Sequence, residues 1–111
     1  MPVYSVKASE FSFDYFQTIK VDMVSDIIDA SEYLLDSKIN STVVCSIDIQ
    51  DTKGDTLMIF DCKVTFDDIV NELNKLMPWI IENEEYEMAQ RIKLIEERLE
   101  DIDVNDYYDE Q

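Results

Sequence analysis

The sequence of 111 residues contains no histidine, a single glycine, two prolines and two cysteines. Without histidine, the chain lacks the commonest general base and the commonest metal ligand, so Ser-His-Asp and Cys-His catalytic arrangements are excluded. One glycine excludes the glycine-rich loops that cradle phosphates. Two cysteines do not make a disulfide framework, and without imidazole they offer too few ligands for zinc. We therefore expect no enzymatic activity, no metal centre and no other cofactor.

Basic residues and long apolar runs are also scarce. No stretch approaches the ~20 apolar residues that span a bilayer, and residues 1–7 lack the apolar core of a signal peptide, so a cytoplasmic location is expected. The chain contains 26 acidic residues and only nine basic ones, which gives a formal net charge of −17. Nucleic acids and anionic membranes are polyanions, so direct binding to either is disfavoured. The expected partner is a basic protein, and the sequence leaves open whether the chain also forms a homodimer.

Hydrophobic residues make up 46% of the chain, and 11% of its residues are aromatic, which is enough for a modest core. At this length one domain is expected. We predict a single α+β domain over residues 1–103, followed by an acidic and flexible tail at 104–111.

The first half of the chain predicts strands on either side of a helix. Residues 3–16 look extended, because Phe11, Phe13 and Tyr15 alternate with polar residues. Helical spacing of apolar residues predicts a helix over 22–39. Lys38 would lie in its last turn, and Asn40 is a reasonable residue for a left-handed stop.

Residues 42–64 predict a β-hairpin whose turn contains Gly54, because glycine tolerates the positive φ of a tight turn. Val44, Leu57 and Ile59 would form a second face, either partly covered or used as a contact surface. Cys45 and Cys62 would face each other if the loop length is even, and both are interpreted as small buried thiols. The residues expected on the first face are Val43, Cys45, Ile47, Ile49, Met58, Phe60, Cys62 and Val64.

The last third predicts two antiparallel helices that share one apolar seam. Thr65 and Asp68 resemble a capping box at the start of the first helix. Pro78 must kink that helix or begin a new turn, because proline lacks an N–H. The chain is expected to turn near Asn83 and Glu84. The complete prediction is a small antiparallel sheet from the N-terminal segment and the hairpin, one packed helix, and a C-terminal helical hairpin.

The segment 82–92 resembles the turn and second helix of the UVR motif, a short helical hairpin of excision-repair nuclease subunits. In that family an acidic turn precedes a run of Tyr or Phe, Glu, any residue, and two alanines. Tyr86, Glu87 and Ala89 fit this run, whereas Gln90 replaces the second alanine. The similarity covers about residues 71–102, and it implies a protein–protein contact or a dimerisation element.

The acidic residues predict the function. Residues 67–111 contain 15 acidic and four basic residues, against 11 and five in residues 1–66. Duplex DNA carries about one charge per 1.7 Å, and a helix rises about 1.5 Å per residue, so an acidic helix can imitate phosphates. The prediction is a non-enzymatic DNA mimic that binds the basic nucleic-acid surface of a host protein, in the style of bacteriophage anti-defence inhibitors. The predicted contact residues are Glu82, Glu84, Glu85, Tyr86, Glu87, Glu96, Glu97, Glu100, Asp101 and Asp103.

Two other functions stay open. In the first, the chain is an immunity protein or antitoxin that neutralises a cationic nuclease toxin through aromatic anchors, because aromatic side chains carry much interface energy. In the second, it is an adaptor that acts through its helical hairpin. The candidate anchors are Tyr33, Trp79, Tyr86, Tyr107 and Tyr108.

Overall fold

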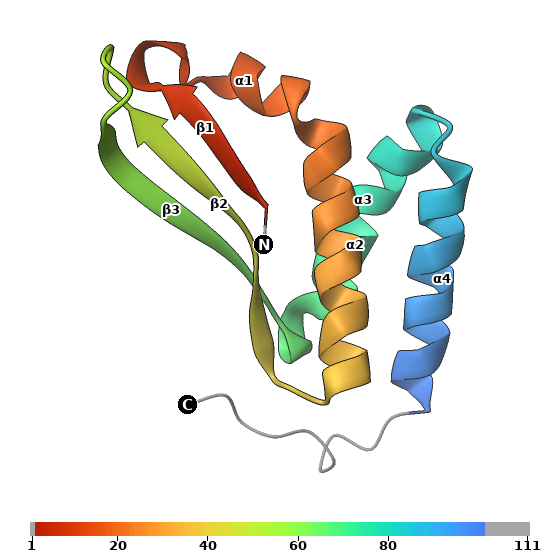
Figure 1. Ribbon diagram of the computed structural model, residues 1–111. Coiled ribbons are helices and arrows are strands. Elements are labelled where there is room, and N and C mark those ends of the chain that lie inside the picture. The colour runs from red at the N-terminus through yellow and green to blue at the C-terminus, as the bar shows by residue number, and fades with distance from the viewer. Residues whose placement is uncertain (1, 102–111) are drawn as a thin grey trace.

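A three-stranded sheet lies against a layer of helices in the computed structural model, which describes residues 2–101 (Figure 1). The strands are β1 (Val3–Lys7), β2 (Ser41–Gln50) and β3 (Thr56–Thr65). The helices are α1 (Phe13–Thr18), α2 (Lys20–Ser37), α3 (Ile69–Glu82) and α4 (Tyr86–Glu100), and two single 3₁₀ turns are η1 (Ala8–Glu10) and η2 (Phe66–Asp68). The predicted α+β class with a C-terminal helical hairpin is confirmed. Asp103, Tyr107, Tyr108 and the predicted tail lie outside the described residues.

The sheet is mixed, so the prediction of an antiparallel sheet is wrong for β1. The strand order is β1-β2-β3, with β2 in the centre. β3 pairs with β2 in antiparallel fashion, whereas β1 runs parallel to β2, with Tyr4 opposite Ile47. A parallel neighbour requires a crossover of a dozen or more residues. Here α1 and α2 provide that crossover and carry the chain back to the same end of the sheet.

The N-terminal segment is extended only as far as Lys7, and the prediction of strand over 3–16 fails beyond it. Residues 13–18 are helical instead. Phe11, Tyr15 and Phe16 pack against a small apolar cluster on the sheet, whereas Phe13 is 77% exposed. Tyr15 and Phe16 therefore reach the sheet from a short helix and Phe11 from the residues before it, so the alternation of aromatic residues does not reflect a strand.

The predicted hairpin is confirmed. Gly54 has φ +90°, and the Asp51 carboxylate accepts hydrogen bonds from the backbone N–H groups of Lys53 and Asp55 at 2.8 and 3.0 Å. The register shifts between Val43 and Cys45, which is a β-bulge at Val44. Val44 is consequently buried in the core, and its predicted place on the second face was wrong.

The helix predicted over 22–39 is α2, and Lys38 is the residue that terminates it. The Lys38 backbone has φ 55°, and its N–H donates to the Leu34 carbonyl, so Lys38 takes the left-handed position that was predicted for Asn40. The next N–H, that of Ile39, donates to the same carbonyl at 3.4 Å. This pattern closes the helix and turns the chain into β2.

The helical hairpin is formed by α3 and α4, and η2 precedes it. Thr65 Oγ1 donates to Asp68 Oδ2 at 2.9 Å, but neither side chain caps a backbone N–H, so the predicted capping box is not formed. Pro78 lies inside α3 rather than at a break. The main core lies between these helices, α2 and one face of the sheet, and its fully buried members include Ile28, Leu34, Ile69, Leu73, Ile80, Ile92 and Ile95.

Candidate interaction surfaces

The negative charge is concentrated in what we call the acidic layer, residues 20–37 and 66–101, which comprises α2, η2, α3 and α4. This layer contains 16 acidic and five basic residues, a formal charge of −11. The only charged residues of the three strands are Lys7, Lys63, Asp48 and Asp61, so the formal charge of the sheet is zero. Figure 1 shows the three helices of the layer on one side of the sheet. The fold therefore separates charge that is spread along the sequence into one charged and one neutral region.

The first group of predicted contact residues surrounds the turn between α3 and α4. The N–H groups of Glu84 and Glu85 donate to the carbonyls of Ile81 and Ile80 at 3.1 and 2.9 Å. Glu84 has φ 57°, so this turn is a Schellman motif with a left-handed glutamate. Tyr86 is 63% exposed at the start of α4. Other exposed members of the group are Glu82, Glu84 and Glu87.

The second group lies at the other end of α4 and includes Glu96, Glu97, Glu100 and Asp101. From Glu87 to Glu96 is nine residues, or about 13–14 Å along the helix. Arg91 and Lys93 lie between the groups. The structure therefore places the predicted residues in two acidic clusters rather than in one continuous row, with Glu85 and Glu96 half-buried.

Two arginines of α4 are already paired with α2. Arg91 bonds to both Glu32 and Asp29, the latter at 2.6 Å, and these two carboxylates raise the pKa of the guanidinium. Arg98 Nη2 lies 2.9 Å from Asp36 Oδ1. These pairs hold α4 against α2, and the two arginines offset carboxylates of α2 rather than those of the two clusters.

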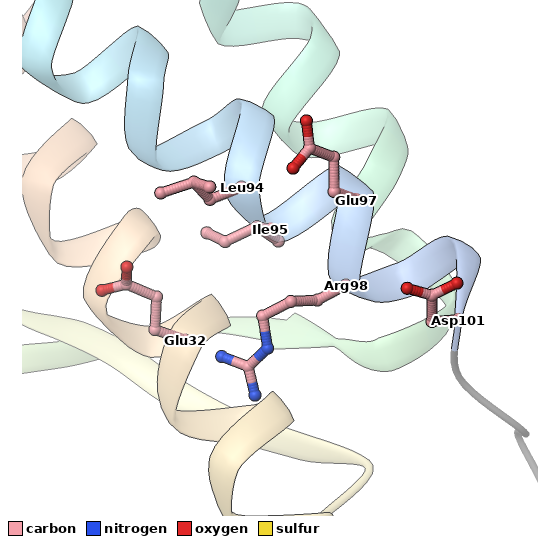
Figure 2. Close-up of a pocket in the computed structure, with 6 residues that line it drawn as sticks. All are labelled: Glu32, Leu94, Ile95, Glu97, Arg98 and Asp101. Carbon is pink, nitrogen blue, oxygen red and sulfur yellow. The ribbon is translucent and has the colours of Figure 1, made fainter.

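A groove of about 420 Å³ opens between α2 and the C-terminal half of α4. Figure 2 shows its six lining residues, with Glu32 on α2 and the others on α4 or just after it. Glu97 and Asp101, two of the predicted contact residues, lie on its rim together with the guanidinium of Arg98. Its remaining lining residues are Leu94 and Ile95.

Strand β3 presents an apolar surface that the prediction of site residues missed. Four consecutive side chains, Leu57, Met58, Ile59 and Phe60, are 60%, 51%, 58% and 44% exposed. β3 is an edge strand, with β2 on one side and no further strand of residues 2–101 on the other. The signal was present in the sequence, because these four residues are apolar on both faces of a strand, whereas a half-buried strand alternates.

Asp48 and Asp61, on the open face of the sheet, accept hydrogen bonds from neighbouring side chains. Asp48 accepts hydrogen bonds from Gln50 Nε2 and Thr56 Oγ1, both at 2.8 Å, and these bonds lower the pKa of its carboxyl. Ser46 Oγ donates to Asp61 Oδ1 at 2.5 Å. The polar side chains of this face therefore satisfy one another's hydrogen-bonding groups.

Cys45 and Cys62 are direct cross-strand partners, so the alternative in which the thiols face each other is the one observed. Both are free, and Cys45 is buried, whereas Cys62 is half-buried. Burial and the neighbouring Cys62 thiol raise the pKa of Cys45 to about 12. Cys45 is therefore protonated near neutral pH and is a poor nucleophile.

Within residues 2–101 no group of three or more histidine, cysteine or carboxylate side chains is arranged to hold a metal ion. Over the same range, none of the helices is long and apolar enough to cross a membrane.

Comparison with known proteins finds no matching family model, no matching curated protein and no matching solved structure. The similarity of residues 71–102 to the UVR motif therefore stays a resemblance.

Proposed function

We propose that this protein is a non-enzymatic inhibitor that binds and blocks a basic, nucleic-acid-binding surface of another protein through its acidic layer. The observation that carries this proposal is the separation of charge. The acidic layer has a formal charge of −11, and two of its five basic residues, Arg91 and Arg98, are bound to carboxylates of α2. The charge presented to a partner is therefore strongly negative, and a partner with the opposite potential is favoured.

The arrangement of the acidic residues supports a mimic of DNA. Each cluster places several exposed carboxylates within a few residues at one end of α4. A helix rises about 1.5 Å per residue, and duplex DNA carries about one charge per 1.7 Å of its axis, so each cluster presents charge at a comparable linear density. The expected binding is fast, and it weakens steeply with salt, because both partners are highly charged.

Tyr33 and Tyr86 favour a second candidate function. Both side chains are more than half exposed, at 53% and 63%, and both lie on helices of the acidic layer. Exposed tyrosines are effective anchors in protein interfaces. An immunity protein or antitoxin would use such anchors to recognise one cationic toxin. In that case Tyr86→Ala would abolish binding to the toxin, and duplex DNA would compete only if the toxin's DNA site is covered.

The experiment is affinity capture from a nuclease-treated bacterial lysate, followed by elution with a short DNA duplex and then with a salt gradient. A captured protein is purified, and its binding to DNA is measured with and without the inhibitor. We expect the duplex to displace it and the inhibitor to block its DNA binding. The proposal fails if captured proteins bind the inhibitor and DNA simultaneously, or if capture is unaffected by raising the salt concentration.

Two variants with the same net charge identify the surface. Glu84→Lys, Glu85→Lys and Glu87→Lys together reverse the first cluster and raise the net charge by six units. Glu10→Lys, Asp14→Lys and Asp55→Lys together raise it equally at exposed positions outside the acidic layer. We expect only the first triple variant to lose affinity by more than about tenfold, the equivalent of about 1.4 kcal/mol. Equal losses would mean that binding depends on total charge and not on this surface. Circular dichroism checks that both variants remain folded.

A further inference from the structure

We propose that two copies of this chain associate through antiparallel pairing of their β3 strands, which forms one continuous six-stranded sheet. The proposal uses a surface separate from the acidic layer and does not depend on the function proposed above. It begins from the edge position of β3, which runs for ten residues, from Thr56 to Thr65. Its outer backbone groups face away from β2, and a long apolar edge of this kind is a template for another strand.

The exposed side chains of β3 explain why a partner strand is favourable. Leu57, Met58, Ile59 and Phe60 are all between 44% and 60% exposed. Ile59 lies on the open face, opposite Asp48, whereas Phe60 lies on the helix-bearing face and stacks on Phe11 with ring centroids 6.3 Å apart. A strand added beside β3 covers apolar groups on both faces at once, which a helix laid on one face does not.

The charges of β3 indicate that the strand that pairs with this edge is β3 of a second copy of the chain. Asp61 and Lys63 are its only charged residues, and they lie on the same face two residues apart. When two copies of β3 pair about a two-fold axis at Cys62, Asp61 of each copy lies opposite Lys63 of the other. The same pairing places Phe60 opposite Val64 and Ile59 opposite Thr65, whereas Leu57 and Met58 lie beyond the end of the partner's β3, next to its η2 turn. Opposite charges directly across an antiparallel pair are stabilising, and symmetry provides the pair twice.

Other two-fold registers along β3 do not match the charges. An axis at Asp61 places the two aspartates opposite each other, which is destabilising. An axis at Phe60 places Asp61 opposite Ile59 and Lys63 opposite Leu57. The formal charge of β3 itself is zero, so the strand avoids the repulsion that the acidic layers of two copies exert. That remaining repulsion is screened by salt.

The test is sedimentation velocity over a range of protein concentrations at low and high salt. We expect a monomer–dimer equilibrium that shifts toward the dimer as salt increases. This is opposite to the salt dependence expected for a basic partner, so failure of either proposal is recognised independently of the other. A chain that stays monomeric at all concentrations and salt conditions, or that forms only larger aggregates, overturns the proposal.

Two exposed apolar residues on opposite edges of the sheet provide a matched pair of variants. Ile59→Lys places a charge on β3, and Val3→Lys places the same charge on β1, where the side chain is 57% exposed. We expect Ile59→Lys to weaken the dimer by about tenfold or more, and Val3→Lys to leave it within about twofold of wild type. The reverse order of effects would assign the contact to β1 and overturn the proposal.

Charge exchange tests the register. Asp61→Lys alone places two lysines opposite each other across the pair, and Lys63→Asp alone places two aspartates opposite each other, so each variant should dimerise more weakly than wild type. Mixed together, the two variants restore both opposite-charge pairs, and we expect a heterodimer to form. If the mixture associates no better than the separate variants, the register centred on Cys62 is wrong.

Discussion

The acidic layer and strand β3 differ in almost every property that governs recognition. The acidic layer carries 16 acidic residues around a buried core of aliphatic side chains, whereas β3 carries one acidic and one basic residue beside four exposed apolar ones. A charged surface selects partners at long range and loses affinity in salt, whereas an apolar edge acts only at contact and is strengthened when repulsion is screened. The comparison predicts that the two proposed interactions of this small domain respond oppositely to salt.

The largest expected difference between the two regions is in packing. Ile80→Ala removes a fully buried side chain of α3 and should lower the free energy of unfolding by about 2–5 kcal/mol. Ile59→Ala removes the same atoms from a side chain that is 58% exposed, and we expect a change within about 0.5 kcal/mol. Urea unfolding at a concentration where the protein is monomeric measures both. Similar losses would mean that Ile59 is buried in solution.

Tyr4 joins the sheet to the acidic layer, because its hydroxyl donates a hydrogen bond from β1 to Asp26 of α2. Tyr4→Phe should lower the free energy of unfolding by about 1.5 kcal/mol at neutral pH, since the acceptor is charged. Tyr33→Phe, at an exposed position, is the control and should have little effect. Urea denaturation compares the two variants with wild type.

The same contact predicts a pH dependence. Burial and Asp26 raise the pKa of Tyr4 above its ordinary value of about 10. The folded state therefore favours the protonated phenol, and this contribution is fully present below about pH 10 and is lost as pH rises toward the higher folded value. The difference in stability between wild type and Tyr4→Phe should shrink above about pH 10. A difference that stays constant well above that pH would contradict the assignment to Tyr4.

Arg91 tests how the acidic layer tolerates its own charge. Arg91→Gln removes the pairs with Glu32 and Asp29, and we expect a loss of about 1 kcal/mol, because the guanidinium is partly shielded and contacts two carboxylates. Arg98→Gln breaks one more exposed pair and should cost less than about 0.5 kcal/mol. Thermal unfolding at low salt measures the loss of stability in each variant. High salt should reduce the difference between the two losses. A larger effect of Arg98→Gln would reverse the interpretation.

The smallest expected effect lies at the junction between the acidic layer and the sheet. Lys38 has φ 55°, a conformation that glycine adopts without a steric penalty. Lys38→Gly should raise the free energy of unfolding by about 0.5 kcal/mol, whereas Lys38→Ala should give no gain. Chemical denaturation distinguishes the two variants. A stabilising alanine would show that removal of the lysine charge, and not backbone strain, is responsible.

Local patterns predicted the hairpin, α2 and the two C-terminal helices, because each has a regular apolar repeat and Gly54 marks the hairpin turn. They failed at Phe13 and Val44, where a period of two in the sequence did not correspond to two faces of a strand. Phe13 begins a short helix and is exposed, and at Val44 a bulge turns two neighbouring side chains toward the core. The division of the predicted contact residues into two clusters is visible in the sequence, because residues 88–95 contain no carboxylate, whereas the left-handed turn at Glu84 is seen only in the structure.

The sequence by itself determined the net charge, the absence of histidine chemistry and the apolar periodicity of the helices, because these follow from residue types and short-range spacing. Only the tertiary structure decided that β1 runs parallel to β2, that the arginines of α4 are bound to α2, and that β3 lies at an edge. These features join residues as far as 62 positions apart in the chain. Long-range pairing depends on how all the elements pack together, and no local stretch of residues encodes it.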